Sequence, residues 1–255
     1  MIAEKRRQEI LRLIEKEGSI RISKLGKLFN VTDMTIRRDI DYLSRQGLVR
    51  RVHGGAISET EGNINLATTF LKRNMEYIQE KEIIGKKAQE FIPDNSTIII
   101  DGGSTNECFA RYLDPKKNLR VITHALNIAW IVSNNENHEL LMAGGILNRL
   151  TMTFNGLEVE NFYNEVNADI LFVSASGISI EEGLTDPEWL DTSFKKSMIK
   201  SSRKVITLAD HHKFDLVTSR TFAPLTAVDI IITDAKLPPE VRRRYIEAGV
   251  NIVLA

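Results

Sequence analysis

Residues 31–40 read Val-Thr-Asp-Met-Thr-Ile-Arg-Arg-Asp-Ile, and this stretch decides the fold of the N-terminal part of the chain. Thr32 is a good helix N-cap, because its hydroxyl can accept a hydrogen bond from a backbone N–H of the first turn. We expect the helix to run to about Gln46 and to end at Gly47. At about 100° per residue, one narrow stripe of this helix is aliphatic and must face a core. The stripe consists of Ile36, Ile40 and Leu43.

The opposite side of the same helix is suited to contact with DNA. It carries Met34 and Arg38, flanked by Thr35 and Arg37. An arginine can donate two hydrogen bonds to a guanine, and a methionine or threonine methyl group can contact the thymine methyl. The alternative is a solvated helix face whose arginines pair with nearby aspartates.

The flanking segments complete a recognisable module. Upstream, residues 2–17 and 23–29 have the periodicity of helices, and Leu25, Leu28 and Phe29 of the second helix are expected to face inward. Downstream, residues 48–55 alternate and then break at paired glycines, which is typical of a small β-wing. Three helices and a wing predict a winged helix-turn-helix. On the wing, the residues suited to the DNA backbone or the minor groove are Arg50, Arg51 and His53.

The charge distribution supports a polyanion partner for this module. The chain of 255 residues has no net charge, but residues 1–55 hold 13 basic against 7 acidic side chains. The remaining residues are correspondingly acidic, so a basic module is joined to an acidic one. Hydrophobic residues make up 42% of the chain, and there is a single cysteine, Cys108. No signal-peptide core or membrane-spanning stretch is evident, and we therefore expect a cytoplasmic protein without disulfides.

Beyond the first module the pattern changes to alternating strands and helices. We expect three parts: a DNA-binding domain at 1–57, a polar linker at 58–75 and an α/β domain at 76–255. Most strand candidates are continuous runs of Ile, Val and Leu, the mark of strands that are buried on both faces of a mostly parallel sheet. They lie at 97–101, 120–123, 139–143, 170–174, 205–210, 230–233 and 251–254, and the helices at 80–91, 106–113, 126–134, 189–201 and 239–248.

One loop of the second module is suited to a phosphate group. The first strand is followed by Asp101-Gly102-Gly103-Ser104-Thr105-Asn106, which opens a helix. Glycines let the backbone approach a ligand, and free N–H groups and hydroxyls at a helix N-terminus attract anions. The alternative is an ordinary strand-to-helix turn without a ligand. The loop is neither a Walker A loop nor a dinucleotide-binding fingerprint.

Further loops are expected at the same edge of the sheet, because ligands of α/β proteins bind at the carboxyl ends of parallel strands. The candidate positions on these loops, and on the helix that follows Gly183-Leu184-Thr185, are Thr123, His124, Gly144, Gly145, Lys195, Asp210 and Lys213.

The sequence resembles the DeoR family of bacterial transcriptional regulators. The resemblance is carried by residues 31–40 together with 48–56, Leu-Val-Arg-Arg-Val-His-Gly-Gly-Ala, and continues over essentially the whole chain. The family usually has Ser in place of Thr32 and Leu in place of Ile40, and both changes conserve the chemistry. The resemblance implies a sensor domain with the ribose-5-phosphate isomerase-like α/β fold that binds a phosphorylated sugar or a related metabolite. It also implies repression of a carbohydrate-catabolic operon and release from DNA when the effector binds.

Most of the family's sensor pattern is present. It departs at Ser104 and His124, where the family usually has Thr and Asn. Ser104 can still donate to a phosphate, whereas His124 is expected either to alter ligand recognition or to be a packed histidine. The matching residues are Asp101, Gly103, Thr105, Thr123, Gly144, Gly145, Gly183, Lys195, Asp210, Lys213 and Phe214.

The competing function is that of an enzyme. Sugar-phosphate isomerases of this fold carry Asp-Gly-Ala-Asp where this chain has Ser174-Ala175-Ser176-Gly177, so the carboxylates for proton transfer are missing there. We expect no catalytic residues, no cofactor and no metal; the pair His211-His212 lacks further ligands at motif spacing. Cys108, Trp130 and Trp189 are expected to be packing residues. The expected partners are double-stranded operator DNA, a phosphorylated sugar and further copies of the chain, as a dimer or tetramer.

Overall fold

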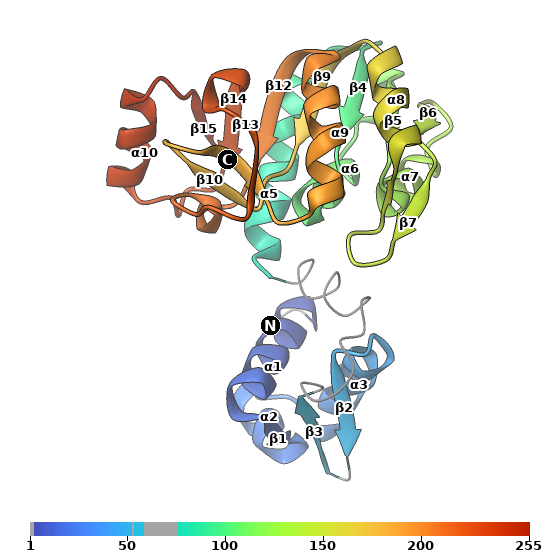
Figure 1. Ribbon diagram of the computed structural model, residues 1–255. Coiled ribbons are helices and arrows are strands. Elements are labelled where there is room, and N and C mark those ends of the chain that lie inside the picture. The colour runs from blue at the N-terminus through green and yellow to red at the C-terminus, as the bar shows by residue number, and fades with distance from the viewer. Residues whose placement is uncertain (1–2, 53, 59–75) are drawn as a thin grey trace. The chain divides into compact units, whose positions relative to one another are not determined.

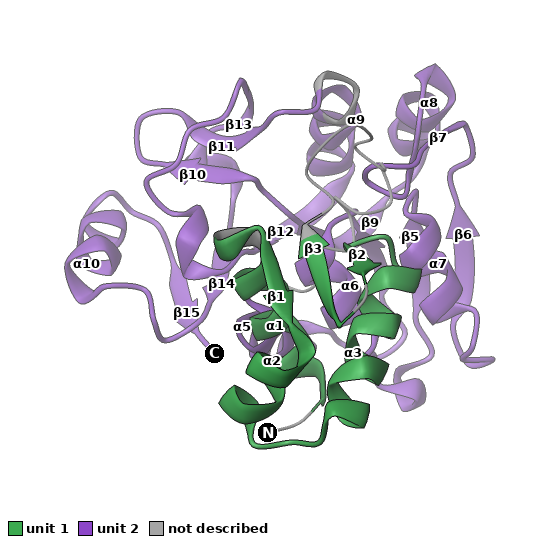
Figure 2. Cartoon of the chain, turned by 90° about the horizontal axis from the view of Figure 1, so that it is seen from below, with its two compact units in different colours: residues 1–76 green, residues 77–255 purple. Residues whose placement is uncertain are grey.

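The computed structural model describes residues 3–52, 54–58 and 76–255 of the chain. It divides into two compact units, residues 1–76 and 77–255 (Figure 2). The expected linker falls almost wholly within residues 59–75, which lie outside the described residues, as does His53.

The first unit is a winged helix-turn-helix, as the sequence predicts (Figure 1). Its three wing strands form an antiparallel sheet in the order β1-β3-β2. The elements are α1 (Ala3–Glu17), β1 (Ser19–Arg21), α2 (Ile22–Phe29), α3 (Asp33–Arg45), β2 (Val49–Val52) and β3 (Gly55–Ser58).

The aliphatic stripe of α3 is the centre of the core of this unit. Ile36, Ile40 and Leu43 are all fully buried, as their spacing predicts. The expected inward position of Leu28 is wrong, because its side chain is 57% exposed. The reason is the orientation of α2 about its axis. The helix packs against the start of α3 through Gly26, where a Cβ atom would lie 2.9 Å from Asp33 Oδ1. In this orientation Leu28 lies outside the buried face of α2.

A buried carboxylate joins α1 to α3. Asp39 is 1% exposed, and its two oxygens accept hydrogen bonds from Arg6 Nε at 2.5 Å and Arg7 Nε at 2.9 Å. Arg6 is itself buried, so this ion pair offsets part of the cost of burying both charges. Asp39 is therefore engaged by α1 rather than by the arginines of its own helix.

Replacing Asp39 by Ala should destabilise the first unit by about 3 kcal/mol, because it leaves the guanidinium of Arg6 buried without its carboxylate. Asp41→Ala is the matched control: its ion pair with Arg51 is exposed, and its loss should cost less than about 1 kcal/mol. Chemical unfolding of the full chain followed by far-UV circular dichroism measures both. Tryptophan fluorescence comes only from the second unit, and an altered fluorescence transition in Asp39→Ala would contradict a local effect.

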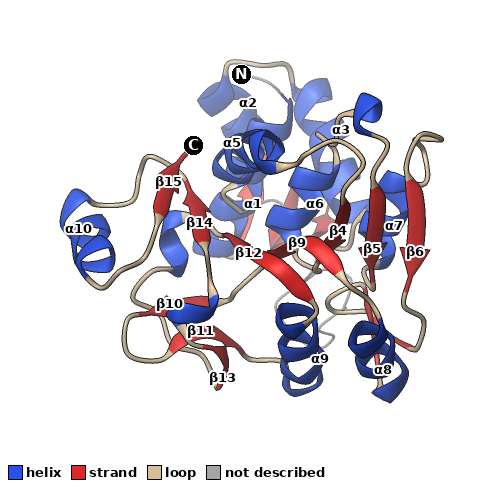
Figure 3. Ribbon diagram, turned by 90° about the horizontal axis from the view of Figure 1, so that it is seen from above, coloured by secondary structure: helices blue, strands red, loops and turns tan. Residues whose placement is uncertain are grey.

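The second unit is built on a seven-stranded sheet in which every neighbouring pair is parallel. The strand order is β15-β14-β12-β9-β4-β5-β6 (Figures 1 and 3). All seven predicted strands are present, although β9 and β12 begin two and three residues earlier than expected. Their bounds are β4 (Thr97–Ile100), β5 (Arg120–Thr123), β6 (Glu139–Met142), β9 (Ala168–Val173), β12 (Ser202–Leu208), β14 (Ile230–Thr233) and β15 (Ile252–Leu254).

Helices cover both faces of this sheet (Figure 3). Ile98 and Ile100 of β4 face one hydrophobic cluster with α5, α6 and α7, while Ile99 faces the other with α8 and α9. This two-sided burial explains the continuous Ile and Val runs. The helices are α5 (Ile78–Ala88), α6 (Ser104–Ala110), α7 (Leu126–Val132), α8 (Leu157–Glu165), α9 (Trp189–Lys200) and α10 (Pro239–Glu247), with short 3₁₀ turns η1 (Gln89–Phe91), η2 (Pro115–Lys117), η3 (His211–Lys213) and η4 (Leu225–Ala227).

Several elements were not predicted from the sequence. They are α8 and five strands of three or four residues, in which the apolar pattern is too short to stand out. The strands are β7 (Ile146–Asn148) paired with β8 (Thr153–Asn155), and β10 (Gly177–Ser179), β11 (Gly183–Asp186) and β13 (Arg220–Ala223) in an antiparallel sheet of order β10-β11-β13.

Two of the expected packing residues can be assessed. Cys108 is 2% exposed, which confirms the expected packing residue, and burial raises the pKa of its thiol to about 11. The expectation for Trp130 is wrong, because this side chain on α7 is 72% exposed. Nothing is described of the side chain of Trp189.

Candidate functional site

The first half of α3 presents an exposed polar face. Thr32 caps the helix through its hydroxyl, which accepts from the backbone N–H of Thr35 at 3.3 Å. Met34 is 59% exposed, Arg37 and Arg38 are exposed, and Thr35 is half-buried. The four side chains expected to reach base edges are thus at or near the surface of the helix start.

Three exposed arginines of this face and of the wing form no ion pair with the nearby aspartates in the described part of the chain. Among the described residues, Arg37, Arg38 and Arg50 form no salt bridge, since Asp39 is bound by α1 and Asp41 by Arg51. The alternative of a self-neutralised helix face is therefore not what the structure has. Unpaired guanidinium groups on an exposed helix are free to bind phosphates or base edges.

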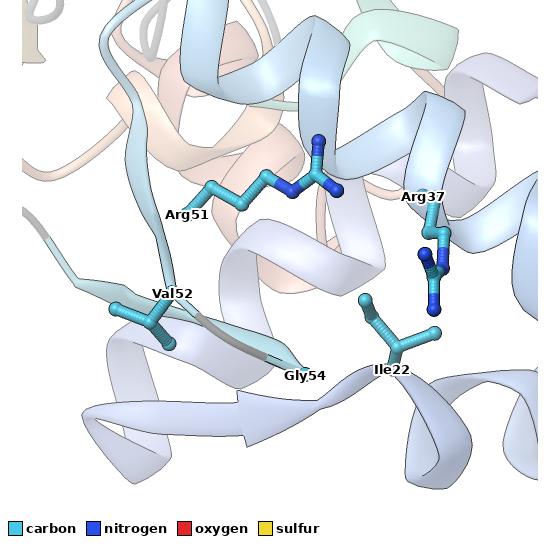
Figure 4. Close-up of a pocket in the computed structure, with 5 residues that line it drawn as sticks. All are labelled: Ile22, Arg37, Arg51, Val52 and Gly54. Atoms are coloured by element: carbon cyan, nitrogen blue, oxygen red, sulfur yellow. The ribbon is translucent and has the colours of Figure 1, made fainter.

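The wing stands next to this face. Arg50 and Arg51 are exposed on β2, and Arg51 Nη1 lies 2.5 Å from Asp41 Oδ1 of α3. An open recess of about 530 Å³ lies beside this contact, between Arg37 of the helix and the wing, and Figure 4 shows the residues around it. Its lining consists of Ile22, Arg37, Arg51, Val52 and Gly54.

In the second unit, a polar cluster lies at the carboxyl ends of β4 and β9. Asp101, directly after β4, is 1% exposed, and its Oδ2 accepts from the backbone N–H of Ser174 at 2.9 Å and from its hydroxyl at 3.0 Å. Lys195 of α9 reaches the same oxygen, with Nζ at 3.3 Å. The structure thus brings together two residues that are 94 positions apart and that the sequence analysis placed in one site.

Lys195 is held from three directions. Its Nζ lies 2.9 Å from Asp186 Oδ2 and donates to the carbonyl oxygen of Ser174 at 3.1 Å, in addition to the contact with Asp101. The residue is only 3% exposed, and its ammonium also stands 4.9 Å from the ring centre of Phe222. A phosphate that binds Lys195 would have to share it with two carboxylates.

His124 joins this cluster from the end of β5. Its Nδ1 lies 2.9 Å from the hydroxyl of Tyr163, and its Nε2 lies 3.7 Å from Asp101 Oδ1. Burial lowers the pKa of His124 to about 4 and raises the pKa of Tyr163 well above its ordinary value. The imidazole is therefore neutral near pH 7, with the Tyr163 hydroxyl protonated beside it.

The glycine loop is shaped by close contacts. A Cβ atom on Gly102 would lie 2.5 Å from the methyl group of Thr153, and Gly103 has a φ of +109° beside the hydroxyl of Ser174. The Nδ2 of Asn106 donates to the carbonyl oxygens of Asp101 and Phe172, so this side chain braces the loop. Ser104 is half-buried and Thr105 is buried at the start of α6.

The remaining candidates follow other strands of the same sheet. Thr123 is fully buried and donates from its hydroxyl to the carbonyl of Ile100 at 2.7 Å, which is a structural bond. Gly145 faces the backbone oxygen of Asn155, where a Cβ atom would lie at 2.6 Å, whereas Gly144 has open space. Asp210 is fully buried and caps η3 through the N–H of His212, and the half-buried Lys213 ends that turn. No described contact joins Asp210 or Lys213 to the Asp101 cluster.

The two adjacent histidines contact Asp234 and Tyr77. His211 Nδ1 lies 2.9 Å from Asp234 Oδ1, and the ring of His212 stacks on that of Tyr77 at 3.7 Å. The described part of the chain contains no group of three or more His, Cys, Asp or Glu side chains suited to a metal ion.

Comparison with known protein families assigns both units. Residues 6–61 match the family described as the DeoR-like helix-turn-helix domain, and residues 76–235 match the DeoR C terminal sensor domain. The chain belongs to the DeoR family of transcriptional regulators.

Relatives from this family match over nearly their full length. The HTH-type transcriptional regulator GolR of Listeria innocua is 32% identical, with 98% of each chain covered. IolR of Bacillus subtilis is 32% identical over 97% of this chain and 98% of its own. The glycerol-3-phosphate regulon repressor of Escherichia coli is 31% identical over 98% of both chains. Among solved structures, ribose 5-phosphate isomerase A of Methanocaldococcus jannaschii is similar over 52% of this chain and 53% of its own, at 17% identity and a TM-score of 0.39.

Sequence reasoning missed four side chains of the cluster in this DeoR-family protein. Ser174 lies in a loop that the sequence placed at this edge of the sheet, but it was not among the candidate contacts; Asp186, Tyr163 and Thr153 lie on β11, α8 and β8. Asp186 directly follows the Gly183-Leu184-Thr185 motif, and this adjacency is a signal that could have indicated it. Nothing in the sequence marks Tyr163 or Thr153, since α8 and β8 were not predicted.

Among the described residues, no helix is long and apolar enough to span a bilayer.

The buried His124 should make the stability of the second unit depend on pH. Above pH 6.5 the imidazole is neutral in both states, whereas between pH 6.5 and 4 only the unfolded chain binds the proton. The free energy of unfolding should therefore fall by up to about 3 kcal/mol as the pH drops through this window. Denaturant unfolding at a series of pH values, followed by tryptophan fluorescence, measures it. His124→Asn removes the titrating group, and an unchanged pH dependence in this variant would contradict the assignment.

Proposed function

We propose that this protein is a sequence-specific DNA-binding regulator that acts in the cytoplasm as a repressor of a carbohydrate-catabolic operon. The observation that carries the proposal is the face of α3, where Arg37 and Arg38 are exposed and form no ion pair with any described residue, next to the arginines of the wing. A single short helix binds DNA weakly, so the active form is proposed to be a symmetric oligomer that places two reading heads on paired half-sites. The direct contacts are proposed to be Met34, Thr35, Arg37, Arg38, Arg50, Arg51 and His53.

The double variant Arg37→Ala, Arg38→Ala should lose specific DNA binding. Each arginine that contacts a base contributes about 1–3 kcal/mol, so the affinity should fall by at least tenfold. The measurement is a gel-shift titration on a duplex that the unmodified protein has selected from a random library.

The matched control is Arg12→Ala, Lys24→Ala, which removes two exposed cations of the same unit whose charges are paired with Glu9 and Glu17. It should bind the selected duplex much as the unmodified protein does. Equal losses in the two double variants would show that net charge, and not the face of α3, governs binding.

We propose further that the second unit binds a phosphorylated sugar or polyol, which releases the protein from DNA. Several features support this: the glycine loop before α6, the hydroxyls of Ser104 and Thr105, and the lysine at position 213 at the same edge of the sheet. One relative is named for the regulon of a phosphorylated polyol, glycerol 3-phosphate. Asp101 and His124 are proposed to meet the hydroxyl end of the ligand. The proposed contacts are Asp101, Gly102, Gly103, Ser104, Thr105, Asn106, Thr123, His124, Gly144, Gly145, Lys195, Asp210 and Lys213.

We also propose that the second unit is not an isomerase. The stretch 174–177 lacks carboxylates, and the nearby carboxylates of Asp101 and Asp186 lie on either side of Lys195. Both carboxylates are engaged with the ammonium group, which suits binding better than proton shuttling. A base in that role would have to be released from the ion pair first.

Replacing Lys213 by Met should weaken binding of the phosphorylated ligand, because bonds between an ammonium and a phosphate are among the strong ones. A thermal-shift screen with glycerol 3-phosphate and a panel of sugar phosphates would first identify a stabilising compound. That compound should then shift the melting temperature of Lys213→Met less than that of the unmodified chain. Lys116→Met is the control, since Lys116 is exposed on η2, which precedes β5 at the opposite edge of the sheet. Equal shifts of the melting temperature in the two variants would show that Lys213 does not contact the ligand.

A further inference from the structure

The ion pair between Arg51 and Asp41 connects the wing to the recognition helix. Arg51 lies on β2 and Asp41 on α3, and the two side chains are 47% and 37% exposed. Asp41 follows Arg37 by four residues, so both lie on the same side of the helix, one turn apart. The Asp41 carboxylate could form an ion pair with an arginine of its own helix, but its partner is Arg51 of the wing.

Because of this contact, the two arginines that line the recess differ in how readily they can bind a phosphate. Arg37 and Arg51 both line it, as Figure 4 shows, yet only Arg37 has its charge uncompensated among the described residues. A DNA phosphate that approaches Arg51 meets a guanidinium already bonded to a carboxylate. The phosphate oxygen has to compete with Asp41 for a charge-assisted bond with that group.

We propose that Asp41 restrains the affinity of the reading head for the DNA backbone by competing with a phosphate for Arg51. The inference rests on the proposed function, since it requires that α3 and the wing face DNA. In the free protein Arg51 and Asp41 neutralise each other, and on DNA the phosphate competes with Asp41 for Arg51 without fully displacing it. Arg51 therefore neutralises less phosphate charge than a free arginine would, and the effective positive charge of the recess is close to that of Arg37 alone.

Two measurable consequences follow for Asp41→Asn. An exposed ion pair of this kind shifts an equilibrium by about two- to fivefold, so the dissociation constant for DNA should fall by that factor. A free Arg51 would also release one more counterion from the DNA on binding. The plot of log K against log salt concentration should therefore steepen by about 0.9.

The experiment uses the full chain and a labelled duplex of mixed sequence, so that no operator has to be known. Fluorescence anisotropy titrations from about 50 to 200 mM salt give the dissociation constant and its salt slope. The matched control is Glu9→Gln on α1, which also removes one carboxylate and frees one arginine, Arg12, from an exposed pair. Arg12 does not line the recess, whereas Arg51 does, so this variant should bind as the unmodified chain does.

The double variant Arg51→Ala, Asp41→Asn completes a double-mutant cycle. Without Arg51 the substitution at Asp41 should no longer tighten DNA binding or steepen the salt slope, because there is no guanidinium left for which Asp41 and the phosphate could compete. Asp41→Ser, which also lacks the carboxylate, should repeat the effect of Asp41→Asn. Circular dichroism melting curves confirm that each variant is folded.

Four results would overturn the inference. Weaker binding by Asp41→Asn would mean that Asp41 orients Arg51 toward DNA. A gain equal to that of Glu9→Gln would reflect net charge alone, and a gain that persists in the Arg51→Ala background would exclude competition for that residue. If the unmodified chain fails to bind DNA even at the lowest salt, the proposed function itself fails; normal binding with an unaltered Asp41→Asn variant rejects only the role of Asp41.

Discussion

The second unit depends on one buried ammonium group. Lys195 is 3% exposed and is held between the carboxylates of Asp101 and Asp186. Such a group is costly to desolvate and is tolerated in a protein interior only when its partners are fixed in place. Through these contacts α9 is tied to the end of β4, to β11 and, by the carbonyl of Ser174, to the segment after β9. The parallel sheet brings these segments to one edge, and the ion pairs fix their relative positions.

The same cluster explains why His124 and Tyr163 can be buried as polar groups. The two side chains satisfy each other through a 2.9 Å contact, and the far side of the imidazole faces Asp101. A charged imidazole would add a second cation to a site that already contains Lys195, and burial keeps it neutral. The polar residues at this edge are thus largely committed to one another. A ligand that bound here would have to replace some of these internal hydrogen bonds with its own. The hydrogen-bond network would then differ between the ligand-bound and the ligand-free protein.

The first unit distributes its charges differently. It buries the carboxylate of Asp39 and uses two arginines of α1 to satisfy it. That contact fixes α3 against α1, and the arginines at the start of α3 form no ion pair with any described residue. The stabilising ion pair is buried and these arginines are exposed, so DNA can bind without disrupting the core. Arg51 is intermediate between these groups, because its partner Asp41 is itself exposed.

The sequence by itself determined the family, the two-unit organisation, all seven strands of the parallel sheet and the exposed polar face of α3. These features follow from local periodicity, capping and continuous apolar runs, which residues close in the chain specify together. The sequence also placed Asp101, His124 and Lys195 in one site, although only as separate loops at one edge of a sheet. Only the tertiary structure decided that Lys195 is shared with Asp186, that Tyr163 faces His124, and that Asp39 belongs to Arg6 and Arg7. Those partners lie on elements far apart in the chain, or on short segments such as α8 and β11 that leave no periodic trace, and nothing local encodes which of them will meet.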